Sequence, residues 1–369
     1  MYKRQDESRR SVLRGGIGIY TSRIPFVWPG AMFNNNGLTI GSLDERDIDG
    51  DVIFLPDPAN QYVDPNFATP SGQVDLFVDD FKYPQVLRGN LAWDKSLNNG
   101  WNVSVEGIYT KTLNNVLYQN VNSDNTVDFN WTGTPDDRPV FVGSSLDDDY
   151  SAIYVGHNTS RGYTYNITGE VNKQFGSNFD ARLSYTYGDA QSINDGTSSQ
   201  NSSQWRGQIN TDGRNNAILG RSDYSPGSRI LGVFNYKLNW NSSGSTATTF
   251  SLIYDGQSGQ AYSSVYARSG GDSRNVNNEE GSTSRNRSLI FVPASPADIN
   301  LIDYTLSDGT VVTAAQQWAN LDALIESDSG LSSRRGQSAE KNGSREPFFS
   351  QIDFAIRQDL GTNVGGRNH

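Results

Sequence analysis

Residues 163–187 alternate between apolar or small side chains and polar ones along two long stretches that meet at a short turn, Gly176-Ser-Asn178. The one exception is Lys173, which occupies an apolar position. A period of two over about a dozen residues is typical of a β-strand with one apolar and one polar face. The strands are roughly twice the average length of soluble strands, which is long enough to cross an outer membrane.

The same alternation recurs along the chain and predicts about eight strands. Short turns such as Asn98-Asn-Gly100 alternate with polar loops of about thirty-five to eighty residues, always in the same order. This asymmetry predicts an all-β fold, an antiparallel up-and-down transmembrane β-barrel with long extracellular loops and short periplasmic turns. The strands are expected near residues 12–22, 85–97, 101–118, 161–175, 179–191, 228–240, 246–263 and 347–360.

One short helix is expected within the longest loop, from Thr313 to Ser327. Its apolar residues recur at helical spacing, which predicts a stripe that packs against the loop. The members of this stripe are Trp318, Leu321, Leu324 and Ile325.

Composition excludes several classes of function. The chain has 369 residues, no cysteine and two histidines, so a disulfide framework, a thiolate metal site and Ser–His catalysis are not expected. A net charge of −11 disfavours nucleic-acid partners. We expect neither an enzyme nor a bound cofactor.

Both ends of the sequence suggest an internal piece of a larger protein. Residues 1–11 are charged, lack a signal peptide and are expected to be a non-native or poorly ordered start, while residues 12–369 form part of a barrel. About eight strands of an unclosed wall would leave two open edges, which hydrocarbon does not tolerate. The chain alone is therefore not expected to transport anything.

A soluble sandwich with one solvated face would also alternate. Strand length, loop asymmetry, aromatic residues near strand ends and the two cut ends together favour the membrane barrel.

Several segments resemble the Oar-like branch of TonB-dependent outer-membrane receptors, which is related to the SusC-like transporters. These segments are spread over nearly the whole chain in the family's order. They are Arg14–Trp28, Tyr83–Arg88, Glu106–Asn115, Ser184–Asp189, Asn194–Ser199, Ser222–Ile230, Gly256–Gly259 and Gln317–Asp322.

The resemblance implies a Gram-negative outer membrane, a roughly 22-stranded barrel, an N-terminal plug and energy supplied by TonB. This chain contains neither the plug nor a TonB box, and it lacks the usual terminal aromatic residue. What the resemblance implies is therefore part of a transporter whose partners are membrane lipid, its own plug, TonB and an unknown small molecule, oligosaccharide or peptide.

Aromatic residues on the long loops are candidate ligand contacts, because their rings can stack on sugars or other ligands. They are Trp131, Tyr150, Trp205, Tyr224 and Trp318. The alternative is that these rings pack the loops against one another, and this alternative is favoured for each of them.

Charged residues on the polar strand faces are expected to point into the lumen, where they would contact the plug or remain plain hydrated wall residues. They are Arg88, Glu106, Glu170 and Arg182.

Two acidic stretches could supply oxygen ligands for Ca²⁺: the run from Asp44 to Asp51, and Asp147, Asp148 and Asp149. Neither matches a defined calcium loop, and a solvated acidic loop is favoured.

The leading functional hypothesis is ligand uptake across the outer membrane. Two alternatives remain open: a surface or adhesion role built on the same barrel, and a small eight-stranded outer-membrane protein independent of TonB. An outer-membrane hydrolase is disfavoured because no fixed pair of acids is evident.

Overall fold

A computed structural model describes residues 2–5, 10–38, 55–60, 72–131, 135–242, 244–266, 276–279, 287–361, 363–364 and 367–368. The acidic run from Asp44 to Asp51 lies outside the described residues.

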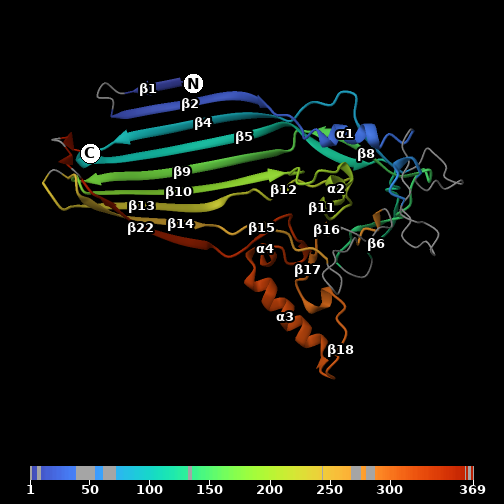
Figure 1. Cartoon of the computed structure of the whole chain (residues 1–369). Coiled ribbons are helices and arrows are strands. Elements are labelled where there is room, and N and C mark those ends of the chain that lie inside the picture. The colour runs from blue at the N-terminus through green and yellow to red at the C-terminus, as the bar shows by residue number, and fades with distance from the viewer. Residues whose placement is uncertain are drawn as a thin grey trace.

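Eight long antiparallel strands form a twisted sheet, which we call the wall, and neighbours in sequence are neighbours in space (Figure 1). They are β2 (Ser11–Thr21), β4 (Gln85–Ser96), β5 (Trp101–Asn120), β9 (Gly162–Phe175), β10 (Phe179–Ser192), β13 (Gly227–Asn239), β14 (Ala247–Gln257) and β22 (Phe349–Asp359). The antiparallel up-and-down arrangement predicted from the alternation is confirmed. The strand expected over 246–263 is split, because β14 ends at Gln257 and a separate β15 covers Ala261–Tyr262.

The first residues extend the wall by one short strand. Residues 2–5, expected to be a poorly ordered start, form β1 (Tyr2–Gln5), which pairs antiparallel with β2. These four residues therefore have regular secondary structure.

The wall has an apolar face and a polar face, as the alternation predicts. Ile17 is 77% exposed and Leu91 60% exposed on one face, and Leu183 and Tyr185 lie on the same face of β10. Ser184 and Arg182 point to the opposite face, because successive side chains alternate along a strand. The apolar face is the one that hydrocarbon covers, and the polar face lines the lumen.

The two ends of the wall differ in size. At one end, adjacent strands are joined by short turns such as η2 (Asn98–Gly100), where Asn99 and Gly100 have φ of 66° and 77°. Asn and Gly tolerate this left-handed conformation, which explains the tight reversal. At the other end the connections build a large folded assembly, which we call the loop layer (Figure 1). By the usual asymmetry of these barrels the turns are periplasmic and the loop layer is extracellular.

Strand β5 joins the wall to the loop layer. Residues 101–114 of β5 pair with β4, β9 or both, whereas Asn115–Asn120 pair with β8 (Tyr150–Thr159). Strand β8 also pairs in parallel with β3 (Gly72–Phe77). Within the described residues these strands, with β12 (Gly220–Arg221) beside β10, complete a sheet of twelve strands.

The loop layer contains helices and short strands. Its helices are α1 (Val27–Asn34), α2 (Asn201–Arg206), α3 (Ala314–Ser327) and α4 (Ser329–Ser332), with 3₁₀ turns η1 (Pro58–Asn60) and η4 (Pro296–Asp298). Its short strands are β6 (Val127–Asn130), β7 (Pro139–Phe141), β11 (Ile209–Asn210), β15, β16 (Arg287–Ser288), β17 (Phe291–Val292), β18 (Tyr304–Thr305), β19 (Val311–Val312), β20 (Gln337–Ser338) and β21 (Ser344–Arg345). Two further short strands, β23 (Asn363–Val364) and β24 (Arg367–Asn368), follow β22.

The expected loop helix is present as α3, and Thr313 caps it by accepting a hydrogen bond from the Gln316 backbone. Ile325 is buried and Leu321 packs beside it, but Leu324 faces solvent, so the predicted stripe is narrower than expected. The expectation of a single helix was incomplete, since α1, α2 and α4 are also present. In the described part of the chain, no helix combines the length and apolarity needed to cross a membrane.

Two apolar clusters hold the loop layer together. One joins α1, α2 and the extended part of β5 through Trp28, Tyr118, Tyr154 and Trp205. The second joins α3 and α4 to β17. Figure 1 shows α3 and β18 projecting beyond the edge of β22.

The two faces of β10 predict opposite responses to the same substitution. Leu183→Arg, if the residue lies near the bilayer midplane, should lower the free energy of unfolding by about 2–4 kcal/mol, because the guanidinium would face hydrocarbon. Ser184→Arg should have little effect because residue 184 faces the lumen. Denaturant titrations of both variants folded in lipid vesicles would measure this difference, and equal losses would contradict the assignment of faces.

Candidate functional site

A pocket of about 520 Å³ lies where the wall meets the loop layer, and we call it the mouth pocket. Thr164 of β9 and Ala190 of β10, which are partners across the two strands, form its wall side. Both side chains lie on the lumen face, because each is an even number of residues from a lumen-facing residue on its own strand. That residue is Glu170 for Thr164 and Arg182 for Ala190. Pro25 and Trp28, from the segment that follows β2, also line it. The mouth pocket therefore lies at the junction of the loop layer and the lumen face of the wall.

Trp28 fixes the segment that covers the mouth pocket. Its side chain is buried, and its indole Nε1 donates a hydrogen bond to the Ser198 carbonyl at 3.0 Å. Asn201 Nδ2 donates to the Trp28 carbonyl at 3.2 Å, and the indole meets the Tyr118 ring edge-on at 5.8 Å. These contacts tie the residues following β2 to the loop that follows β10.

Some polar groups of the mouth pocket are hydrogen-bonded within the protein, and others face the pocket or the solvent. Asp195 accepts hydrogen bonds from the hydroxyls of Ser192 and Ser222 at 2.5 and 2.6 Å, so its carboxylate has a structural role. Tyr224, at the rim, is 69% exposed and presents its ring to solvent. Thr112 and Thr164 add hydroxyl groups on the lumen side. A ligand held here would contact the Tyr224 ring at the rim and the hydroxyl groups of Thr112 and Thr164 on the lumen side.

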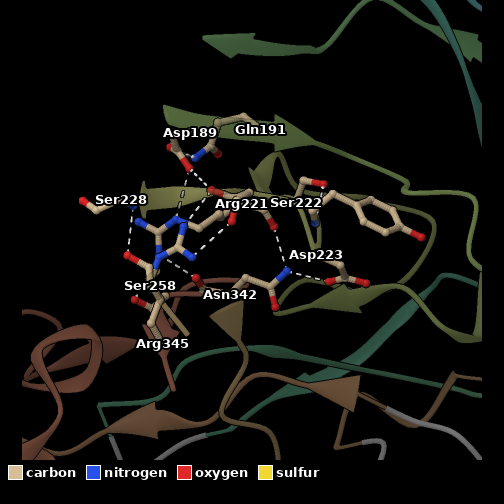
Figure 2. Close-up of polar contacts among 12 residues, drawn as sticks. Asp189, Gln191, Arg221, Ser222, Asp223, Ser228, Ser258, Asn342 and Arg345 are labelled. Carbon is tan, nitrogen blue, oxygen red and sulfur yellow. Dashed lines mark hydrogen bonds and ion pairs between the residues drawn. The ribbon is translucent and has the colours of Figure 1, made fainter. Parts of the chain in front are cut away.

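A cluster of charged and amide groups, which we call the clasp, fixes the chain just before β22 (Figure 2). Its members are Asp189, Arg221, Ser225, Asn342 and Arg345. Arg221 donates to the Asn342 carbonyl at 2.7 Å and to Asp189 at 3.3 Å. Arg345 donates to the Ser225 hydroxyl at 2.8 Å, and that hydroxyl donates to Asp189 at 2.6 Å.

Asn342 is the most buried member of the clasp. Its side-chain amide donates to the Arg221 carbonyl at 2.8 Å and to Asp223 at 2.7 Å, as Figure 2 shows. Its side-chain oxygen accepts from the Ser263 hydroxyl at 3.0 Å. The backbone at Asn342 has a φ of 53°, a conformation that asparagine tolerates better than most residues.

Lys341 precedes the clasp and is buried against β10. Its ammonium donates to the carbonyls of Ser192 and Ile193 and lies 3.8 Å from Asp195. Burial lowers the pKa of Lys341, and the nearby carboxylates of Asp195 and Asp223 partly offset that effect. Burial also lowers the pKa of Arg345. The positive charge of the neighbouring Arg221 lowers it further, as the second largest cause. Holding these cations out of water requires the surrounding oxygens.

The predicted lumen residues take part in a network on the polar face of the wall. Glu106 accepts hydrogen bonds from Arg14 and Asn90, and Glu170 lies 3.5 Å from Arg182. Arg88 donates to the Thr110 hydroxyl at 3.0 Å. Arg14, which the sequence did not single out, also donates to Asp94 at 2.9 Å. Arg14, Glu106 and Glu170 border a concavity of about 430 Å³, which Arg88 and Arg182 do not line.

The five aromatic candidates are not brought together. Only Tyr224 lines the mouth pocket. Trp205 is fully buried, donates to Asn215 at 2.7 Å and stacks with Arg214, so it supports the loop layer rather than presenting a ring to a ligand. Trp131 and Tyr150 are half-buried, and the Tyr150 ring lies against Gly37. Trp318 is half-buried on α3.

Asp147, Asp148 and Asp149 lie in a loop that hydrogen bonds of Asp147 hold in place. Asp147 accepts a hydrogen bond from the Asp149 backbone, and its own backbone N–H donates to Asn122. Asp148 and Asp149 are exposed. Within the ranges that the structure describes, no group of three or more acidic or histidine side chains could hold a metal ion.

Asn342 provides a test of the clasp. Asn342→Ala should lower the free energy of opening the loop between β14 and β22 by about 2–3 kcal/mol, because buried partners lose their hydrogen bonds. Cleavage of this loop by protease added to intact cells should accelerate at least thirtyfold, on the order expected from that change.

Asn342→Gly serves as the matched control, because it removes the same hydrogen bonds while tolerating a positive φ. It should accelerate cleavage nearly as much as Asn342→Ala. Wild-type cleavage rates in both variants would show that the clasp does not hold the loop.

Comparison with known proteins agrees with this architecture. The family model described as "Outer membrane beta barrel domain" matches residues 3–366, which is nearly the whole chain. No curated protein and no solved structure gives a significant match. With its continuous wall of alternating strands, the chain belongs to the outer membrane beta barrel domain family, and its place is the outer membrane of a Gram-negative bacterium.

Proposed function

We propose that this chain forms part of the wall and loop layer of a TonB-dependent transporter, which binds a ligand at its extracellular mouth and takes it up with energy transmitted through TonB. The observation that carries the proposal is the position of the mouth pocket. It is bounded by loop segments on one side and by lumen-facing positions of β9 and β10 on the other. A ligand bound there would already lie at the entrance to the barrel interior.

The shape of the sheet supports a barrel larger than eight strands. In an eight-stranded barrel the first and last strands would pair. Among the described residues, the sheet instead runs from β1 to β22 without a pairing between these two edge strands. Open edges expose unpaired backbone groups, which must find partners in hydrocarbon. Further strands, as in the large plugged transporters, would supply those partners.

The lumen network is suited to a plug. Arg14, Glu106, Glu170 and Arg182 place several charges on one side of the wall, and the concavity that Arg14, Glu106 and Glu170 border is polar. Side chains of this kind can exchange partners with a movable domain at small cost, because surface ion pairs contribute little each.

One observation favours a surface or adhesion role as the second candidate. The hairpin of β18 and β19 projects from the loop layer and exposes Ile302, Leu306 and Val311. Exposed apolar side chains gathered on a projecting segment are suited to contact with another protein.

Uptake can be tested without knowing the ligand. Cells that produce the whole transporter of which this chain forms part should deplete at least one compound from yeast-extract medium faster than cells that lack it, as measured by mass spectrometry of the medium. Depletion should stop when a protonophore is added and in a strain without TonB. Tyr224→Ala, at the rim of the mouth pocket, should slow depletion by about tenfold, the effect of losing one aromatic contact of the larger kind.

Tyr304→Ala is the matched control, because Tyr304 is an exposed tyrosine on β18 that does not line the mouth pocket. It should leave depletion unchanged. Depletion that persists without TonB would contradict the transport proposal. If no compound is depleted, the adhesion role would be favoured instead.

A further inference from the structure

Lys173 is the residue that breaks the alternation of β9, and the structure shows where its charge lies. It sits near the turn-side end of the strand, two residues before Phe175, and its partners across the sheet are Trp101 and Ala181. Its parity is that of Ile167 and Val171, so its side chain lies on the lipid-facing side of the wall. The end of β9 and the following turn place it at the periplasmic boundary of the membrane.

Two aromatic rings hold the ammonium group. The Nζ atom lies 4.8 Å from the centre of the Trp101 ring and 4.7 Å from that of Phe175. The rings meet edge-on at 5.8 Å, and Phe179 packs against Phe175 at 5.3 Å. Cation–π contacts of this kind orient an ammonium group but leave its charge uncompensated.

Among the described residues, none of the positions that flank Lys173 on this face carries a carboxylate. Glu170 points to the lumen, where it is paired with Arg182. The nearest positions on the lipid-facing side are all uncharged. They are Trp101, Val103, Val171, Phe175, Phe179, Ala181 and Leu183. Across the part of the chain that the structure describes, Lys173 takes part in no ion pair.

We infer that Lys173, Trp101 and Phe175 form a binding site for the phosphate of a phospholipid in the periplasmic leaflet. At this depth the anions that can approach an outward-facing ammonium are lipid phosphates. Lysine places its methylene groups along apolar surface and its charge at the headgroup level, and indole rings favour the same zone. The rings of Trp101 and Phe175 restrict the positions that the Lys173 ammonium group can take, so that the group is already placed to bind a phosphate.

The site should favour anionic over zwitterionic lipid. Phosphatidylglycerol carries a net negative charge, whereas the phosphate of phosphatidylethanolamine is partly offset by its own ammonium group. The attraction of one basic residue to an anionic membrane surface corresponds to about a fivefold change in affinity.

Lys237 provides a matched control within the same wall. It lies at the periplasmic end of β13, one residue beyond Tyr236, the partner of Phe179. Its parity is opposite, so its side chain faces the lumen. Replacing either lysine by glutamine removes the same charge near the periplasmic end of the wall.

The test measures binding of phosphatidylglycerol to the protein purified from outer membranes in detergent, by native mass spectrometry and by the lipid-induced rise in Tm. Lys173→Gln should weaken binding about fivefold and Lys173→Arg should retain it, because the charge is kept. Lys237→Gln should bind as the wild type does. Heat-modifiable migration on gels would show that each variant is folded.

Three outcomes would overturn the inference. Unchanged lipid binding by Lys173→Gln would show that the lysine makes no such contact. An equal loss of lipid binding in Lys237→Gln would show that binding depends only on the net charge of the protein. A Lys173-dependent rise in Tm with inorganic phosphate alone, with no further rise from lipid, would assign the site to free phosphate instead.

Discussion

The hydrogen bonding of the backbone is the constraint on which this structure depends. Inside a membrane every N–H and C=O must be paired within the protein, because no water is available. The pairing of β9 with β10 meets this demand without a break, from Phe179 opposite Phe175 to Ser192 opposite Gly162. Once that register is set, every side chain is assigned to lipid or lumen, since a slip by one residue would reverse both faces.

The position of the loop layer is set by strands that extend from the wall. Strand β5 extends beyond the paired region and carries β8 and β3 with it. Strand β10 holds β12, and the clasp fixes residues 342–345 against this corner. The mouth pocket lies between these rigid attachments, so its shape is set by the same register that satisfies the backbone in the membrane.

The sequence predicted the wall well and the loop layer poorly, for a physical reason. Alternation is a local property that each strand carries along its own length, and Lys173 was visible as its exception. The burial of Trp205, the anchoring by Trp28 and the partners of Asn342 depend on segments far apart in the chain, which periodicity does not reveal. Helix α1 was missed because Pro29 and Gly30 lie within it, and both residues disfavour helix interiors. The lumen positions of Glu106 and Glu170 followed from parity, but their partners Arg14 and Arg182 required the register between strands.

The most direct measurement is the labelling of single cysteines along β10. The natural chain contains no cysteine, so each substitution at positions 181–186 would give a unique thiol. The structure predicts that positions 181, 183 and 185 react with a lipid-soluble maleimide and positions 182, 184 and 186 with a water-soluble one. Equal labelling of neighbouring positions by both reagents would contradict a wall that separates lipid from lumen.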